Sequence, residues 1–321
     1  MAIDYVVPMG FPQDLKWRHD YIAANGMFCD DKQSINNTRY RTWGTEELLI
    51  RLIRKNLPWI RTIHILLARP SQVEYLSGLN NLSNQSNPNV HFVFHKDFMP
   101  KEVLPTFNSR AIEMYLHRIP GLAPYFLYGN DDMFPMAPMV VEDFFRRKGD
   151  NGGSNNDITE NRYNDSETAS LWPCLHYTRK TFNPSSAFHQ ACMNGLNFVA
   201  DNFKQHFEGY WLHIGHNVVP IVKATCEMFW RQCPKKMQGS VTRYRLAQNY
   251  NQYIYSWWQI LSGQYVDYKP TRGYVSTSNS INEIINAIRT TDGLLCINDN
   301  DAVNDITNLA AIVRSEMQKR L

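Results

Sequence analysis

A short apolar run that ends on two adjacent carboxylates constrains the fold of this chain more than any other feature. Residues Tyr125–Tyr128 are large and apolar, and Pro124 and Gly129 bound them, a pattern typical of a buried β-strand. The polar residues that follow are Asn130, Asp131 and Asp132. At the carboxyl end of such a strand in an open α/β sheet, carboxylates commonly hold Mg²⁺ together with substrate phosphates. The sequence therefore predicts a metal-phosphate site, and simple turn formation by Asn130 and Asp131 is the alternative.

Strand-like and helix-like segments alternate along the first half of the chain. Apolar runs predict strands at residues 3–7, 63–67 and 91–94. Between the first two, helical spacing of leucine and isoleucine follows Thr45, which is a suitable N-cap, and Pro58 ends the pattern. This alternation predicts an α/β fold in which helices flank a central, Rossmann-like sheet.

The second half is predicted to elaborate the same unit. Residues 148–170 are rich in Gly, Asn, Asp and Ser and predict a mobile surface loop. Helical patterns at residues 185–207, 218–230 and 248–261 predict a mainly helical insertion over residues 171–289. A strand at 294–297 and an amphipathic helix then return to the sheet. We therefore expect one domain over residues 1–321, with an α/β core formed by residues 1–147 and 290–321.

Composition excludes several kinds of protein. The formal net charge is +3 and the basic residues are scattered, so a nucleic-acid partner is not expected. The six cysteines form no CxxC pair and read as reduced core thiols. The amino terminus lacks a secretory signal pattern, and no run approaches the roughly 20 apolar residues of a membrane span. These features predict a cytoplasmic protein, and peripheral association with a membrane polysaccharide assembly is compatible with them.

Four blocks of sequence occur in an order that points to a known family. HRIPGLAPYFLYGNDDMF contains the predicted acidic site, LPTFNSRAIE comes shortly before it, and RYRTWGTEELLIRLIRKNLPWIRTIHILLA precedes both. HIGHNVVPIVKATCEMFW with TRYR, and then LLCINDND, follow. Together with residues 4–17, these blocks resemble the Stealth family of sugar-phosphate transferases. The resemblance implies a glycosyltransferase-A-like fold and transfer of a hexose- or N-acetylhexosamine-1-phosphate from a UDP-sugar to a sugar hydroxyl in capsular or other surface polysaccharide.

The first block departs from the family pattern at one position. The family usually reads roughly DVVYTWVDGSDPEW where this chain reads DYVVPMGFPQDLKW. Phe11 stands where the family has the acid of WVDG, whereas Asp14 and Trp17 match. Any role of that acid is therefore expected to be absent from this chain or carried by another residue.

The resemblance also implies the metal ligands. Asp131 and Asp132 are expected to bind Mg²⁺ (or Mn²⁺) bridging the donor diphosphate. Asn298 and Asp299, at the end of the predicted strand at 294–297, are expected to complete this site from across the sheet. Capping of the last helix is the structural alternative for Asp299.

A histidine and two arginines are the catalytic candidates besides Asp131. His216, expected just before a helix, matches the third-block histidine and suits a general base because imidazole titrates near neutral pH. Helix capping or packing is the alternative role. Arg243 and Arg245 match the arginine region of that block, and a guanidinium can grip two phosphate oxygens. Arg245 is the preferred clamp, and if the segment is a strand both share one face, so a solvated basic edge is the alternative for at least one.

Candidate donor-binding residues lie in the first two blocks and beside the acids. The start of the helix predicted at 107–116 offers backbone N–H groups to an anion, or is simply capped by Asn108 or Ser109. Arg39 and Arg41 are expected to hold the nucleotide diphosphate, and Asp4 and Asp14 to lie near the base or ribose. The full set is Asn108, Ser109, Arg110, Arg39, Arg41, Asp4, Asp14 and Asn130.

Two other functions fit the same sequence. An ordinary glycosyltransferase would cleave at the anomeric carbon and release the nucleoside diphosphate, whereas a sugar-phosphate transferase releases the monophosphate. A non-catalytic binder of sugar nucleotides would release neither, and the replaced acid at Phe11 motivates this alternative. The nucleotide that is released distinguishes the three.

Overall fold

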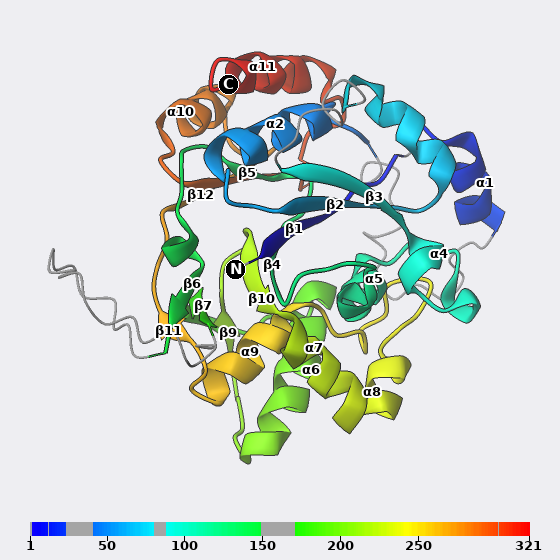
Figure 1. Ribbon diagram of the computed structural model, residues 1–321, viewed down its shortest axis with the longest axis vertical. Coiled ribbons are helices and arrows are strands. Elements are labelled where there is room, and N and C mark those ends of the chain that lie inside the picture. Colours follow the sequence, from blue (N-terminus) through cyan, green and yellow to red (C-terminus); the bar gives the residue numbers. More distant parts are fainter. Residues whose placement is uncertain (1, 12, 24–40, 80–87, 149–170, 301) are drawn as a thin grey trace, which may run out of the picture.

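A five-stranded sheet organises the molecule (Figure 1). The computed structural model describes residues 2–11, 13–23, 41–79, 88–148, 171–300 and 302–321. The sheet has the order β10-β4-β1-β2-β3, in which β10 is antiparallel to β4 and the other neighbours are parallel. Its strands are β1 (Ile3–Pro8), β2 (Thr62–Leu67), β3 (Asn89–Phe94), β4 (Tyr125–Tyr128) and β10 (Val219–Val222).

Both faces of this sheet are buried because its strands are apolar on both sides. In β1, Tyr5 and Val7 belong to one hydrophobic cluster, whereas Val6 belongs to the other. Helix α2 lies on the first face, with α10 and α11 beyond it in the same hydrophobic cluster, and α5, α6, α7 and α9 lie on the second (Figure 1). Such two-sided burial is typical of parallel sheets with helical crossovers. The predicted α/β fold with flanking helices is confirmed.

The helices have the following bounds. The longer ones are α1 (Leu15–Ala23), α2 (Glu46–Asn56), α6 (Ala187–Ala200), α7 (Lys223–Gln232), α9 (Tyr253–Leu261), α10 (Ile281–Thr290) and α11 (Thr307–Gln318). The short ones are α4 (His95–Phe98), α5 (Ser109–Met114) and α8 (Pro234–Gly239). Thr45 occupies the N-cap position of α2 as predicted, although its side chain makes no capping hydrogen bond.

The order of the strands creates a crevice at one edge of the central sheet. The chain passes from β1 through β2 to β3 in one direction, and β4 then returns to the other side of β1. Ligands in open α/β sheets bind where the strand order reverses, outside the carboxyl ends of the strands. The acids predicted to form the site follow β4 and therefore lie at this switch point.

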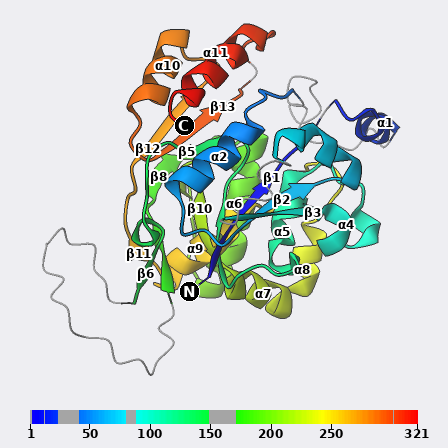
Figure 2. The ribbon, with the colours of Figure 1, turned by 45° about the horizontal axis from the view of Figure 1, so that its top comes forward.

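A separate three-stranded sheet brings the end of the chain to the same edge. It consists of β12 (Arg272–Ser276), β13 (Leu294–Asn298) and β5 (Met133–Pro135). Figure 2 shows α10 and α11 packed beside it. The expectation that the strand at 294–297 joins the central sheet is wrong, because β5, which directly follows the acids, pairs antiparallel with β13 instead.

The predicted mainly helical insertion is a mixture of strands and helices. It contributes β10 to the central sheet, β12 to the second sheet, and a small sheet of β8 (Thr178–Thr181) and β9 (Tyr210–His213). Its strands β7 (Leu171–Leu175) and β11 (Val266–Asp267) form another small sheet with β6 (Phe145–Arg147), which precedes the insertion. The helix predicted at 218–230 begins only at Lys223, because β-branched residues before it form β10, whose Pro220 is tolerated in an edge strand. Most of the predicted loop at 148–170 lies outside the described residues.

Two expectations from composition concern thiols and membranes. All five cysteines in the described part of the chain are free, and four are buried. None of the helices described has the length and apolar character of a membrane span.

Candidate active site

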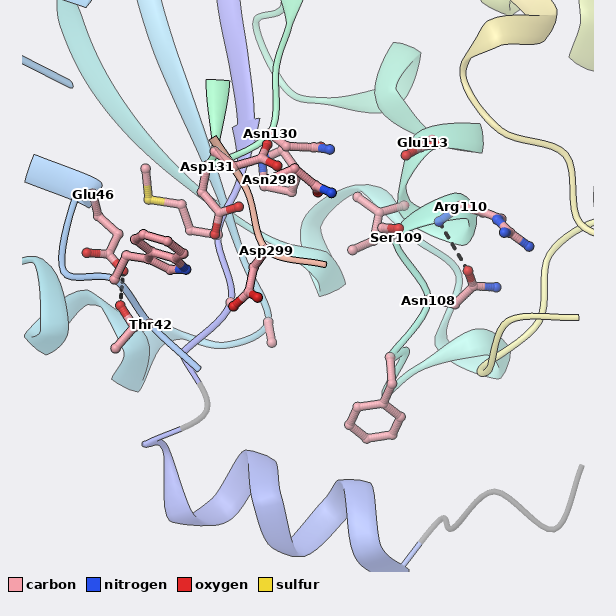
Figure 3. A pocket seen from close by; sticks show the side chains of 18 of the residues that line it. Thr42, Glu46, Asn108, Ser109, Arg110, Glu113, Asn130, Asp131, Asn298 and Asp299 are labelled. Carbon is pink, nitrogen blue, oxygen red and sulfur yellow. Dashed lines mark hydrogen bonds between the residues drawn. The ribbon is translucent and has the colours of Figure 1, made fainter. Parts of the chain in front are cut away.

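The carboxyl ends of β1 and β4 open into a cleft of about 420 Å³. Figure 3 shows polar side chains on its walls that come from the turn after β4, from α5 and from the segment after β13. The predicted site residues that line this cleft are Arg41, Asn108, Ser109, Arg110, Asn130, Asp131, Asp132, His216, Arg245, Asn298 and Asp299. Segments far apart in sequence thus converge on one cavity.

The two acids after β4 stand in an environment rich in negative charge. Asp131 is exposed on the cleft wall. Poor solvation within the cleft raises its pKa to about 7, and the like charges of Asp132 and Glu46 add to this effect. The described residues around Asp131 therefore supply little compensating positive charge.

In the described part of the chain, only one of the two carboxylate oxygens of Asp132 has polar partners. Its Oδ2 lies 3.7 Å from His216 Nε2 and accepts a weak hydrogen bond of 3.6 Å from the Cys296 thiol. Its Oδ1 is buried and has no hydrogen-bond partner among the described residues. A buried carboxylate oxygen without a partner is costly, so this atom is suited to a ligand.

The residues around Asp132 fit a hard divalent cation. Asp132, His216 and Cys296 offer atoms that lie within 4.8 Å of one another. Burial raises the pKa of Cys296 strongly, with Asp132 adding to the shift, so this sulfur stays a neutral thiol and a weak ligand. The remaining donors are mainly oxygens, the ligand type that Mg²⁺ and Mn²⁺ prefer. The orphaned Oδ1 of Asp132 marks the most suitable position for such an ion.

Pairing of β13 with β5 carries the fourth block to the acids. Cys296 pairs with Met133, and the Ile297 N–H donates to the Asp132 carbonyl at 2.9 Å. Asn298 follows and lines the cleft, where its Nδ2 donates to the Tyr274 hydroxyl at 3.0 Å. Asn298 is therefore close to the acids, as predicted, although it arrives on the second sheet.

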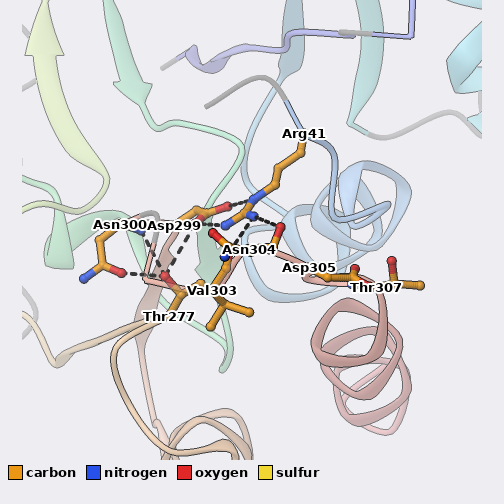
Figure 4. A network of polar contacts seen from close by, with 8 residues as sticks. All are labelled: Arg41, Thr277, Asp299, Asn300, Val303, Asn304, Asp305 and Thr307. Atoms are coloured by element: carbon orange, nitrogen blue, oxygen red, sulfur yellow. Dashed lines mark hydrogen bonds and ion pairs between the residues drawn. The ribbon is translucent and has the colours of Figure 1, made fainter. Parts of the chain in front are cut away.

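Asp299 forms an ion pair with Arg41. Its carboxylate accepts from Arg41 Nε at 2.6 Å and from Nη2 at 2.7 Å (Figure 4). Arg41 Nη1 also donates to the carbonyls of Val303 at 2.6 Å and Asn304 at 3.0 Å. The bidentate pair ties the segment before α2 to the loop before α11. In this structure Arg41 and Asp299 bind each other, and their roles as diphosphate ligand and metal ligand stay predictions.

His216 lies in the loop between β9 and β10, not before a helix as expected. Gly215 precedes it with φ of +93°, a conformation that favours glycine. The His216 side chain is 34% exposed and faces Asp132. Burial lowers its pKa, but the hydrogen bond and charge of Asp132 outweigh this, so the net pKa is raised. The pair holds the imidazole at the cleft wall beside the acids.

Asn108 anchors a second wall of the cleft. As N-cap of α5, its Oδ1 accepts from the Arg110 N–H at 3.1 Å. Its Nδ2 donates to the carbonyls of Thr242 and Tyr244 at 3.1 Å each and to Asn249 Oδ1 at 2.9 Å. The side chain is fully buried and occupied, so the predicted substrate contact is replaced by a structural one. With six residues, α5 is also too short to offer much of a helix dipole.

The two candidate arginines point in different directions. The segment is irregular, because Asn249 binds its backbone at Leu246 and Ser240. Arg245 Nη2 donates to Ser109 Oγ at 2.8 Å and lines the cleft. Arg243 is exposed, lies away from the cleft lining and donates to the Leu104 carbonyl at 2.8 Å. The structure supports Arg245 as a site residue and does not support Arg243.

Several other predicted residues lie away from the cleft. Asp4 is buried at the amino end of β1, where Arg61 and His64 bind it, so it is not near a base or ribose. Asp14 caps α1 by accepting from the N–H groups of Lys16 and Trp17 at 3.0 Å each. The carboxylates of Asp4 and Asp14 therefore form hydrogen bonds that stabilise the fold. Arg39 lies outside the described residues.

Phe11, which replaces the acid of the family pattern, is part of the core. It is 2% exposed and stacks on Tyr75 with ring centroids 5.4 Å apart. The position therefore contributes packing in this protein and offers no polar atom to the cleft.

Glu113 lines the cleft and is not among the predicted site residues. It is buried, and it accepts from the Gln252 N–H at 2.9 Å and the Tyr128 hydroxyl at 3.2 Å. Burial raises its pKa, while Gln252, Arg110 and Arg245 oppose the shift. Its position within the family-like segment LPTFNSRAIE could have indicated that Glu113 belongs to the site. Glu46 of α2 was also missed, and only the folded structure brings its charge near Asp131.

Comparison with known proteins identifies the region of a known family in the chain. Residues 39–152 match the family described as Stealth protein CR2, conserved region 2. Over 317 residues the chain is 27% identical to the capsular polysaccharide phosphotransferase WcwK of Streptococcus pneumoniae, covering 92% of this chain and 90% of that protein. Residues 39–152 thus carry a Stealth-family region, and the relatives that match nearly the whole chain support a Stealth-family phosphotransferase.

Other matches extend over nearly the whole chain. The exopolysaccharide phosphotransferase cps2G of Lactiplantibacillus plantarum is 26% identical over 350 residues, covering 99% of this chain and 94% of that protein. Among solved structures, the apo WbbM bifunctional glycosyltransferase matches with a TM-score of 0.42 and 9% identity, covering 99% of this chain and 51% of that one. On the strength of the sequence relatives, the protein is a phosphotransferase enzyme.

Proposed function

We propose that this protein transfers a hexose- or N-acetylhexosamine-1-phosphate from a UDP-sugar to a sugar hydroxyl, forming a phosphodiester in capsular or other surface polysaccharide. The observation that carries the proposal is the convergence of Asp131, Asp132, His216 and Arg245 on one cleft at the switch point. The names of the relatives, which are capsular and exopolysaccharide phosphotransferases, support the product class.

The reaction places a separate demand on each group. The acceptor hydroxyl oxygen attacks the β-phosphorus, and the bond from that phosphorus to the oxygen bridging it to the α-phosphorus breaks. UMP leaves with the bonding electrons, and the bond between the sugar and its phosphate stays intact. His216 takes the proton of the attacking hydroxyl, because it is partly exposed in the cleft and imidazole titrates near neutral pH.

Negative charge on the diphosphate must be neutralised for this attack. Asp131 and Asp132, with Asn298 beside them, would hold Mg²⁺ or Mn²⁺, which when bound supplies positive charge to the phosphate oxygens. Arg245, held by Ser109 on the opposite wall, grips a further phosphate oxygen. Arg41 and Asp299 hold the rim of the cleft together.

The fate of the β-phosphate tests this proposal. The enzyme is incubated with UDP-N-acetylglucosamine, UDP-glucose or UDP-galactose labelled with ³²P at the β-phosphate, with Mg²⁺ and mixed methyl glycosides as acceptors. Label in the glycoside product together with UMP supports sugar-phosphate transfer. Label that stays in released UDP supports an ordinary glycosyltransferase, and donor binding without release of either nucleotide supports a non-catalytic binder.

A further inference from the structure

We propose that Phe188 is the stacking surface of an acceptor subsite for an uncharged pyranose at the mouth of the cleft. The inference deepens the proposed function and rests on it for the identity of the acceptor as a sugar. Phe188 is the second residue of α6, lines the cleft and is 41% exposed. Its neighbour in space, Trp211, is only 3% exposed. The exposed Phe188 ring thus faces the cleft and packs against the buried Trp211 ring.

Aromatic neighbours hold the Phe188 ring in place. Trp211 of β9 meets it edge to face, with centroids 6.0 Å apart and planes at 83°. Trp211 in turn contacts His189 at 5.4 Å and His213 at 5.1 Å. A ring that is fixed before the ligand arrives loses little freedom on binding. The cluster therefore provides a preorganised platform.

The platform lies on the same wall as the group that would receive the acceptor proton. His213 ends β9, and three residues later the loop reaches His216 beside Asp132. This loop is held by hydrogen bonds to its backbone, from Arg272 to the Ile214 carbonyl at 3.0 Å and from Tyr253 to the Gly215 carbonyl at 3.4 Å. Phe188 and His216 both line the cleft, so a sugar resting on Phe188 lies in the same cavity as the proposed base.

The other end of the cleft suits the donor better. Met9 and Gly10, directly after β1, line it together with Gln72 and His95, which follow β2 and β3. These are the strand ends at which nucleotides bind in sheets of this topology. A donor placed there leaves the Phe188 end for the acceptor.

The chemistry of the platform favours an uncharged sugar. The C–H face of a pyranose carries small positive partial charges that match the negative face of an aromatic ring. Burial, together with nearby cations that include Lys180, lowers the pKa of His213 to about 4, and burial also lowers that of His189. Both imidazoles next to Trp211 are therefore neutral at pH 7, and the platform has no charged ring to attract an anion.

Saturation-transfer NMR with the full chain tests the subsite without requiring turnover. The probes are methyl glycosides of glucose, galactose, N-acetylglucosamine and rhamnose, added to wild type, Phe188→Ala, Phe188→Tyr and Ile281→Ala. Ile281 is a matched control because it is 43% exposed on α10 and lies outside the cleft lining. We expect transfer to ring protons of at least one glycoside with wild type, Phe188→Tyr and Ile281→Ala, and a loss of signal with Phe188→Ala.

Acceptor kinetics complete the test. For a glycoside that reacts, we expect Phe188→Ala to raise the acceptor KM about five- to tenfold, the size of one lost aromatic contact, with a much smaller change in the donor KM. Equal glycoside binding by wild type and Phe188→Ala, no binding by either, or equal rises in both KM values would overturn the subsite. Binding that depends on Phe188 without UMP release would support the subsite while contradicting the proposed function.

Discussion

The two ends of the central sheet use aspartate in opposite ways. At the amino end, Asp4 accepts from Arg61 at 2.9 and 2.6 Å, contacts His64 Nε2 at 3.0 Å and accepts from the Ala123 N–H at 2.7 Å. At the carboxyl end, Asp132 keeps a buried oxygen without a hydrogen-bond partner in the described part of the chain. A carboxylate with all its partners stabilises the fold, whereas one that lacks them is prepared for a ligand.

The pKa values express the same contrast. Burial would raise the pKa of Asp4, but the bonds from His64, Arg61 and Ala123 outweigh it and lower the value to about 2. The pKa of Asp131 is raised to about 7 by poor solvation and by the charges of Asp132 and Glu46. Ionisation is favoured by the protein at one end and opposed at the other, so a cation is needed only at the carboxyl end.

The largest effect is expected from Asp131→Asn. Loss of one carboxylate from the acid pair should lower kcat/KM for UMP release about 10³-fold, because charge stabilisation at the diphosphate is lost. The free protein should be as stable as wild type or more stable, since repulsion between like charges is relieved. Steady-state kinetics and thermal unfolding measure both quantities. If the variant retained a tenth of the wild-type kcat/KM, the proposed role of Asp131 in the site would be contradicted.

Asp4→Asn should have the opposite effects on activity and stability. It leaves Arg61 and His64 without their buried anion, so the free energy of unfolding should fall by about 3 kcal/mol at pH 7 while kcat/KM changes little. Denaturant titration of the folded variant at low temperature measures the loss.

The pH dependence of this loss follows from the lowered pKa of Asp4. A carboxylate with a lowered folded-state pKa stabilises above its unfolded value near 4, and this contribution disappears as pH falls through about 2. The difference between wild type and Asp4→Asn should therefore shrink between pH 4 and pH 2. A difference that stays constant over this range would contradict the structural role of the Asp4 charge.

Arg245 and Arg243 provide a matched pair that differ by two positions. Arg245→Ala should lower kcat/KM about 30- to 100-fold, the size of a lost charge-assisted hydrogen bond to phosphate. Arg243→Ala should change it less than twofold, because that side chain lies outside the cleft lining. Equal losses in the two variants would indicate that the shared segment, rather than the Arg245 guanidinium, matters for catalysis.

The smallest expected effect is stabilisation of the free protein by Mg²⁺. A cation that binds only the folded state at ten times its Kd adds about 1.4 kcal/mol to the free energy of unfolding. We expect thermal unfolding of wild type to shift upward with added MgCl₂, with NaCl of equal ionic strength as control. The shift should be lost in Asp132→Asn and retained in Asp4→Asn. An equal rise in unfolding temperature in all three proteins would show that the ion binds away from Asp132.

Much of the fold could be predicted because local patterns decide it. The strand Tyr125–Tyr128 has the bounds that its flanking proline and glycine indicate, and the alternation of strands and helices gives the α/β class. The prediction of one helix over residues 218–230 was wrong in its first part, because an apolar run of this length can form a strand or a helix. Pairing with β4, a contact between distant segments, makes its first part a strand.

The site was predictable only in part for a related reason. Sequence blocks located Asp131, Asp132, His216 and Arg245, all of which line the cleft. The partners of a side chain depend on tertiary structure, so the sequence could not distinguish Asp4 from Asp132. Likewise, nothing local indicates that Arg41 and Asp299, 258 positions apart, neutralise each other.

The most direct measurement is the nucleotide released from UDP-sugars by wild type, Asp131→Asn and Asp4→Asn under identical conditions. Reactions contain Mg²⁺, mixed methyl glycosides and protein shown by circular dichroism to be folded, and chromatography separates UMP from UDP. We expect UMP from wild type and from Asp4→Asn, and almost none from Asp131→Asn. Release of UDP, or equal UMP from Asp131→Asn and wild type, would contradict phosphotransfer at the carboxyl end of the sheet.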